Sequence, residues 1–240
     1  MPAPPNRWGL PEALFGFAVG ILVSAAATLV AEAATGYRFA GGAPLPLPVT
    51  AADIGGLWVG LLAAVSIASR RNGRGVLSED YGLAFHWWDA PVGVAVGAAG
   101  QYLLFPALYL PVEAANHRLG RNIVDHLGGP ALRETAAVHG PGRVVLLYIL
   151  LAAGAPLVEE LFFRGLLLRG LLARLPGIPS VLVSAVFFAV AHFELLQFAG
   201  LAAFGVVLGL LSWRSGRLGP GVVAHATFNA AALAAYVRIH

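Results

Sequence analysis

Apolar runs of about 20 residues, the length of a membrane-spanning helix, recur along this 240-residue chain. Hydrophobic residues make up 58% of the sequence and charged residues only 11%, whereas an average soluble domain carries about 25% charged residues. So few charges cannot cover the surface of a soluble globule, which excludes a soluble enzyme, a disordered protein and a coiled coil. We therefore predict an all-α fold, a polytopic transmembrane bundle of about seven to eight helices.

The apolar runs also predict where the helices lie. One long apolar segment should start near Arg143 and end before Pro176, as one long helix or as two abutting helices. The stretch Gly41–Pro48 should not be helical, because proline removes a backbone donor and fixes φ, and we expect a loop at residues 77–90. The other spans are expected at residues 13–34, 52–69, 91–112, 179–192, 195–213 and 221–237.

Three pairs of glycines have the GxxxG spacing that lets two membrane helices approach closely. We expect each pair to lie at a contact between helices. The pairs are Gly16 and Gly20, Gly93 and Gly97, and Gly205 and Gly209.

The basic residues predict an orientation in the membrane. All 15 are arginine, the formal net charge is only +3, and the arginines lie in short segments between apolar runs. We interpret them as a topology signal and predict no nucleic-acid partner, only the lipid bilayer. Placing the N-terminus inside puts nine arginines inside and six outside. Together with a bacterial-looking composition, this predicts an integral protein of a bacterial cytoplasmic membrane with its N-terminus inside.

Charged residues interrupt the apolar segment that starts near Arg143. Ionisable groups at membrane depth cost about 2.5–3.5 kcal/mol each on insertion scales, and they usually mark a function or a polar cavity. Glu160 and Arg164 are four residues apart and can pair on one helix face. Glu159 then points about 100° away as a free carboxylate. A purely structural alternative is that Glu159 and Glu160 only mark a helix end at the membrane interface.

Two further runs place histidines in apolar surroundings. His192 ends the motif FAVAH, and His225 and Asn229 lie four residues apart in HATFN, on one helix face. His225 follows Pro220 by only five residues. It can reach the depth of Glu159 only if the basic turn Arg214–Pro220 is sunk into the protein.

These side chains allow two chemistries. A carboxylate beside a histidine can take a proton from water, while the other histidine and the amide donate hydrogen bonds to an oxyanion. Alternatively, Glu159, His192 and His225 form a His₂Glu set that could hold zinc, with another residue such as Glu160 as the base. The chain has no cysteine and no HExxH motif.

The motifs EELFFRG, FAVAH and HATFN together resemble those of the CPBP family, which comprises type II CAAX-processing endopeptidases and bacteriocin-immunity (Abi) proteins. The resemblance implies one transmembrane domain over residues 1–240, with N-terminal helices at 1–142 and a catalytic core at 143–237. It implies that Glu159 and His192 activate water and that His225 and Asn229 stabilise the oxyanion. Glu160 and Arg164 would shape the site.

The sequence therefore predicts an intramembrane endopeptidase that cleaves a membrane-associated peptide or protein. Its mechanism is glutamate-dependent or, in the alternative, dependent on zinc. A second alternative from another class is a non-catalytic membrane scaffold or bacteriocin-immunity protein. The sequence makes no prediction about oligomeric state.

Overall fold

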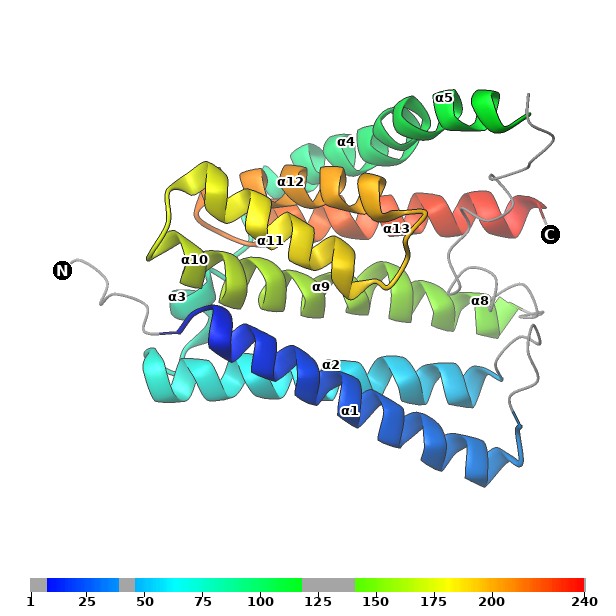
Figure 1. The fold of residues 1–240 in the computed structure, drawn as a ribbon, viewed down its shortest axis with the longest axis horizontal. Coiled ribbons are helices and arrows are strands. Elements are labelled where there is room, and N and C mark those ends of the chain that lie inside the picture. The colour runs from blue at the N-terminus through cyan, green and yellow to red at the C-terminus, as the bar shows by residue number, and fades with distance from the viewer. Residues whose placement is uncertain (1–7, 39–45, 118–140, 240) are drawn as a thin grey trace.

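The computed structural model describes residues 8–38, 46–117 and 141–239. Within these ranges every regular element is helical and there is no strand, which confirms the all-α prediction. The chain passes back and forth along one direction, so that sequential long helices run antiparallel (Figure 1). The helices are α1 (Leu10–Thr35), α2 (Leu47–Asn72), α3 (Leu77–Tyr81), α4 (Asp89–Ala99), α5 (Phe105–His117), α8 (Pro141–Leu147), α9 (Ala155–Glu160), α10 (Arg169–Leu172), α11 (Gly177–Ala191), α12 (Phe198–Ser215) and α13 (Gly219–Ile239).

Five helical stretches of the described ranges are long and apolar enough to cross a membrane by length and composition. They are α1, α2, the stretch Asp89–Val112, the stretch Val144–Leu172, and α12. Helix α11 is apolar but has only 15 residues. The chain is thus an integral membrane protein with several membrane-spanning helices, as its composition predicts.

Helices α8, α9 and α10 form one continuous helix from Pro141 to Leu172. The segment is therefore one long helix and not two abutting helices. Wider π-helical turns at Tyr148–Gly154 and Leu161–Leu168 connect its parts. Pro156 at the start of α9 cannot donate to the preceding turn, and the widened turns before it accommodate that loss. All eight residues of the second π-helical stretch are buried.

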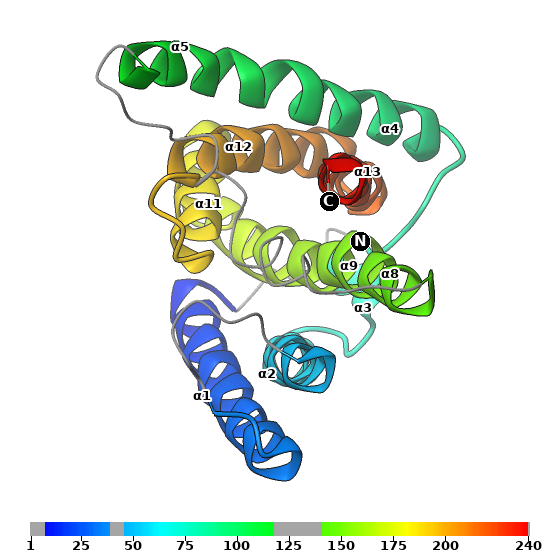
Figure 2. The same ribbon diagram turned by 90° about the vertical axis from the view of Figure 1, so that its right-hand side faces the viewer.

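The α8–α10 helix lies at the centre of the bundle. Figure 2 shows it between the α1–α2 pair on one side and the helices α11, α12 and α13 on the other. It contacts α1, α2, α3, α11, α12 and α13. The side chains of its second π-helical stretch, Leu161–Leu168, are therefore surrounded by other helices rather than by lipid.

All three GxxxG pairs lie at helix contacts, as expected. A Cβ at Gly16 or Gly20 would meet side chains of α2. A Cβ at Gly93 or Gly97 would meet α13, and one at Gly205 or Gly209 would meet α11. Because a larger residue would push the backbones apart, these glycines set the spacing of the bundle.

Some expected boundaries are wrong. Helix α2 begins at Leu47, so the end of the Gly41–Pro48 stretch is helical; Pro48 falls in the first turn, where its missing N–H has no partner to lose. Residues 39–45 lie outside the described ranges. Residues 77–90 are not all loop, because α3 buries Tyr81, whose hydroxyl donates to the Val65 carbonyl at 2.7 Å. Burial raises the pKa of Tyr81.

Seven of the described arginines lie in segments at the end of the bundle where α1 begins and α2 ends. They are Arg70, Arg71, Arg74, Arg169, Arg174, Arg214 and Arg217. Their gathering supports the predicted inside location of that end, and the orientation stays a prediction. The division of the chain at residue 142 also stays a prediction, since residues 118–140 lie outside the described ranges.

Replacing Gly56 with valine should destabilise the α1–α2 contact, whereas the same change at the neighbouring Gly55 should not. A Cβ at Gly56 would lie 2.7 Å from the Ser24 Cα, while a Cβ at Gly55 meets nothing within 4 Å. We expect Gly56→Val to lower the free energy of unfolding by about 1–3 kcal/mol, measured by thermal unfolding in detergent. Equal melting of the two variants would contradict this account of the contact.

Candidate active site

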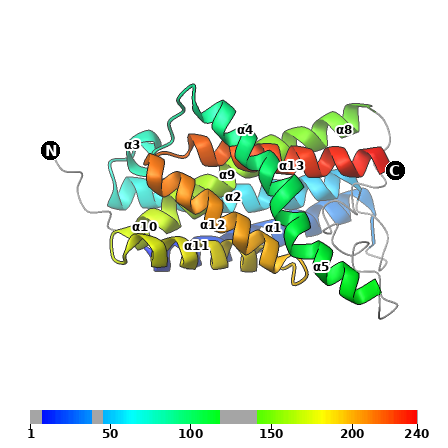
Figure 3. The same cartoon turned by 90° about the horizontal axis from the view of Figure 1, so that it is seen from above.

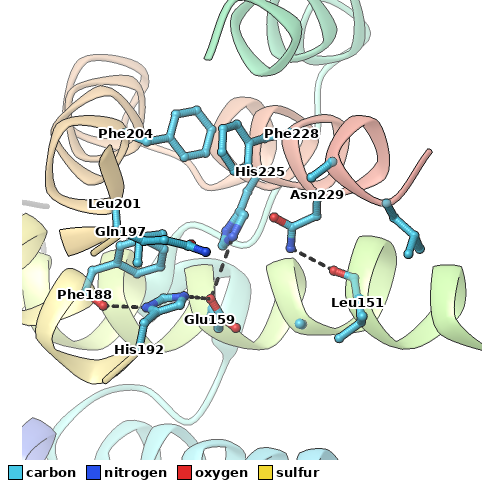
Figure 4. A pocket seen from close by; sticks show the side chains of 13 residues that line it. Leu151, Glu159, Phe188, His192, Gln197, Leu201, Phe204, His225, Phe228 and Asn229 are labelled. Atoms are coloured by element: carbon cyan, nitrogen blue, oxygen red, sulfur yellow. Dashed lines mark hydrogen bonds and ion pairs between the residues drawn. The ribbon is translucent and has the colours of Figure 1, made fainter. Parts of the chain in front are cut away.

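Three segments bring the sequence-predicted residues together in the interior (Figure 4). The α8–α10 helix carries Glu159, Glu160 and Arg164, and α13 carries His225 and Asn229. His192 follows the last residue of α11 and caps its C-terminal end. All six side chains that the sequence singles out therefore lie in one region, although they come from distant parts of the chain.

The end of the basic turn before α13 is buried, as the approach of His225 to Glu159 requires, whereas Arg214 and Gly216 near its start are exposed. Leu218, Gly219 and Pro220 are buried. The Leu218 N–H donates to the Gly82 carbonyl at 2.8 Å and the Gly219 N–H to the Ala84 carbonyl at 3.2 Å. The segment between α3 and α4 thus covers the turn and lets α13 start below the end of the bundle.

A buried ion pair forms the base of the site. Arg164 Nη1 donates to Glu160 Oε1 at 2.7 Å, and both side chains are fully buried. His225 Nδ1 lies 3.1 Å from the same Glu160 oxygen. Arg164 also donates through Nη2 to the Gly205 carbonyl at 3.1 Å and lies 4.4 Å from the centre of the Phe188 ring. The pair therefore ties the central helix to α11, α12 and α13.

Glu159 points away from this ion pair, as helix geometry predicts. Its Oε2 atom is buried and has no hydrogen-bond partner among the residues that the structure describes. That oxygen lies 3.9 Å from His192 Nε2 and 3.8 Å from His225 Nε2. Both distances are too long for direct hydrogen bonds and are suited to a water that bridges the carboxylate and the rings.

The other nitrogen of each ring fixes the tautomer of the neutral histidine. His192 Nδ1 lies 2.7 Å from the Phe188 carbonyl oxygen, and His225 Nδ1 faces the Glu160 carboxylate. Because both partners only accept, each Nδ1 must carry a proton. Each neutral ring then presents an Nε2 lone pair toward Glu159. His225 can donate from Nε2 only in its doubly protonated form.

Asn229 supplies a neutral donor to the same region. Its Nδ2 donates to the Leu151 carbonyl at 2.8 Å, which holds the amide in place. A primary amide nitrogen carries two hydrogens, so one N–H remains for another acceptor.

A cavity of about 220 Å³ opens beside these side chains. Glu159, His192, His225 and Asn229 supply most of its polar groups, and aromatic and aliphatic side chains supply the rest. Sequence analysis missed Gln197, whose side chain also borders this cavity (Figure 4). Its place five residues after His192, in the turn that leads into α12, is the signal that could have identified it.

Glu159, His192 and His225 resemble a zinc site in the orientation of their rings but not in the spacing of their donor atoms. Both rings anchor Nδ1 and leave Nε2 free, an arrangement found in zinc sites. Tetrahedral zinc with bonds of about 2.0–2.1 Å sets neighbouring donor atoms about 3.4 Å apart, whereas Glu159 Oε2 lies 3.8 and 3.9 Å from the two Nε2 atoms. In the described ranges no group of three or more His, Cys, Asp or Glu side chains is gathered closely enough to hold a metal ion. As placed, the donors fit a bridging water better.

Residues 141–231 match a family model described as type II CAAX prenyl endopeptidase, Rce1-like. This part of the chain is therefore similar to the type II CAAX endopeptidases. The match confirms the resemblance predicted from the three motifs and includes all six site residues. The family is one of proteases, so the match supports a CAAX-type membrane protease at the level of the family. Comparisons with curated proteins and with solved structures gave no match.

The Glu160→Gln variant should lose much of its stability, because it leaves the Arg164 charge buried without a counter-charge. Breaking one partner of a buried ion pair costs about 3–5 kcal/mol. We expect a large fall in the thermal unfolding midpoint in detergent. The matched control is Glu79→Gln, because Glu79 forms an exposed pair with Arg74 at 2.8 Å, and exposed pairs contribute at most about 1 kcal/mol. If both variants melt like the wild type, the ion pair has no structural role.

Proposed function

We propose that the chain is an intramembrane endopeptidase that hydrolyses a peptide bond of a membrane-associated peptide or protein. The proposal is carried by one observation: Glu159 Oε2 is buried, has no hydrogen-bond partner, and lies within 3.9 Å of two histidine Nε2 atoms beside a cavity. The family match supports proteolysis in general, and the geometry suggests which residues carry it.

In the proposed mechanism Glu159, assisted by the lone pair on His192 Nε2, takes a proton from a bound water. The resulting hydroxide forms a bond to the carbonyl carbon of the substrate, and the carbonyl π electrons move to oxygen. The remaining Asn229 N–H and doubly protonated His225 stabilise that oxyanion. When the tetrahedral intermediate collapses, the C–N bond breaks and the proton on Glu159 passes to the leaving amine.

The substrate class follows from the position of the cavity. It lies at the middle of membrane-spanning helices, and its walls include Phe188, Leu201, Phe204 and Phe228. A peptide bond reaches this site with least cost when the residues around it are apolar or are attached to the membrane. We therefore propose a membrane-embedded or membrane-anchored peptide as the substrate.

Replacing Glu159 with glutamine should abolish cleavage and leave the fold intact. Loss of a positioned general base slows a reaction by about 10²–10⁴, and Glu159 makes no hydrogen bond through its buried Oε2. The measurement is mass spectrometry of membrane-active and lipidated peptides incubated with purified protein in detergent. Glu79→Gln serves as the control, because it makes the same chemical change at an exposed site.

Equal cleavage by the wild type and Glu159→Gln would refute the role of Glu159. If both proteins fold but neither cleaves any peptide, the non-catalytic scaffold remains as the alternative. The phenotype of a cell that carries Glu159→Gln then distinguishes a scaffold from a protease. A scaffold keeps its phenotype with that substitution, and a protease loses it.

The Asn229→Asp variant should lower kcat by about 10²–10³, the effect of removing one oxyanion donor, with a much smaller change in KM. The aspartate keeps the shape of asparagine but replaces an N–H donor with an acceptor, which also faces the Leu151 carbonyl now accepting at 2.8 Å. Cleavage kinetics measure the effect, and a melting curve checks the fold. An unchanged kcat would remove Asn229 from the proposed oxyanion site.

Chelation distinguishes the two versions of the protease. The glutamate-dependent mechanism predicts full cleavage after EDTA treatment. Elemental mass spectrometry should first show that the treated protein holds less than one equivalent of metal per chain. Loss of cleavage that added zinc restores would instead assign Glu159, His192 and His225 as ligands.

A further inference from the structure

A second hollow of about 450 Å³ lies away from the catalytic cavity, between α4 and α12. Both helices pack on α13, and Figure 3 shows α4 crossing α13 obliquely, with α12 lying beside α13. The walls are Val92 on α4 and Val207, Leu210 and Leu211 on α12. Nothing in the proposed peptidase mechanism uses this hollow.

One end of the hollow is charged. Arg214, Ser215 and Arg217 border it where α12 ends, and Trp88 and Asp89 border it where α4 begins. Trp88 is 53% exposed and stacks on Trp87. Amphipathic rings of this kind favour the headgroup level of a membrane, so the charged end lies at the membrane surface.

The balance of charge at this end is positive. Arg217 donates to the buried Asp89 carboxylate through Nε and Nη2 at 2.6–3.2 Å, which offsets one charge and leaves Nη1 of Arg217 without a bond to Asp89. Arg214 is exposed, stacks over the Trp213 ring at 5.1 Å, and forms no ion pair within the described part of the chain. One arginine charge is therefore uncompensated, and its planar donors match the geometry of a phosphate.

The other end of the hollow continues into apolar depth. A neighbouring hollow of about 400 Å³ shares Val207 and is bordered by Val96, Leu103, Leu104 and Phe204. From Val92 to Leu104 the helix rises about 18 Å at 1.5 Å per residue. One leaflet of the hydrocarbon core is about 15 Å thick. The groove is thus long enough to hold one acyl chain across the depth of a leaflet.

We infer that this groove, defined by Val92–Leu104 and Val207–Arg217, is a binding site for a diacyl phospholipid with an anionic headgroup. The headgroup phosphate binds Arg214 and the free Nη1 of Arg217, and one acyl chain lies along the apolar walls. The inference is independent of the proposed peptidase activity, because none of these groups except Phe204 borders the catalytic cavity.

The test is native mass spectrometry of the purified full-length chain in detergent with added phosphatidylglycerol or phosphatidylcholine of the same chain length. We expect phosphatidylglycerol to bind at least about tenfold more tightly, because the choline cation of phosphatidylcholine neutralises the same phosphate and weakens its attraction to the uncompensated arginine charge. Arg214→Gln should remove that preference, because a charge-assisted hydrogen bond contributes about 1.5–3 kcal/mol, which is about tenfold or more in affinity. The control is Arg70→Gln, which removes an exposed arginine at the same end of the bundle but outside the groove.

Each outcome bears on the inference. Loss of the preference in Arg214→Gln, with Arg70→Gln like the wild type and both melting normally without lipid, supports the site. Equal binding of the two lipids overturns it, as does an equal loss in the two variants, which would show general surface attraction. Stabilisation by inorganic phosphate as large as that by phosphatidylglycerol would show an ion site without an acyl groove and also overturns it.

Discussion

The buried contact between Glu160 and Arg164 determines how the rest of the site is arranged. An ion pair this deep would cost more than it returns if its remaining polar atoms had no partners. The protein offsets part of that cost from three directions, with His225 on the carboxylate, the Gly205 carbonyl on the guanidinium, and the Phe188 ring against its face. Glu160 Oε2 and Arg164 Nε are buried without a hydrogen-bond partner among the described residues. Those three partners belong to α13, α12 and α11. The charge pair thus positions the helices that carry the histidines.

This arrangement explains how two adjacent carboxylates can have different roles. Glu160 is fully buried and bound by two cationic or hydrogen-donating groups. Glu159, one residue earlier, keeps 19% of its side chain exposed and turns toward the cavity. Gly221 allows Glu160 to take its buried position, because a Cβ at residue 221 would lie 3.1 Å from Glu160 Oε2. The absence of a side chain on α13 leaves room for the buried carboxylate beside His225.

Much of this could be predicted from the sequence, because the relevant signals are local. Helix periodicity places Glu160 and Arg164 on one face and Glu159 on another, and apolar runs locate the spans. The tautomers of His192 and His225 could not be predicted, since they depend on the Phe188 carbonyl and on Glu160, which is 65 residues from His225. The sunken turn before α13 depends on backbone bonds to Gly82 and Ala84. No local pattern announces such long-range partners.

The shortness of α11 has a consequence for the surrounding lipid. Its 15 residues span about 22 Å, whereas the hydrocarbon core is about 30 Å thick. The turn after α11 therefore ends inside the bilayer, and it exposes Phe193 and Leu195, at 73% and 89%. A helix that is too short draws the lipid headgroups inward around its end. A bilayer that thins beside His192 to match this short helix would leave water less hydrocarbon to cross before it reaches Glu159.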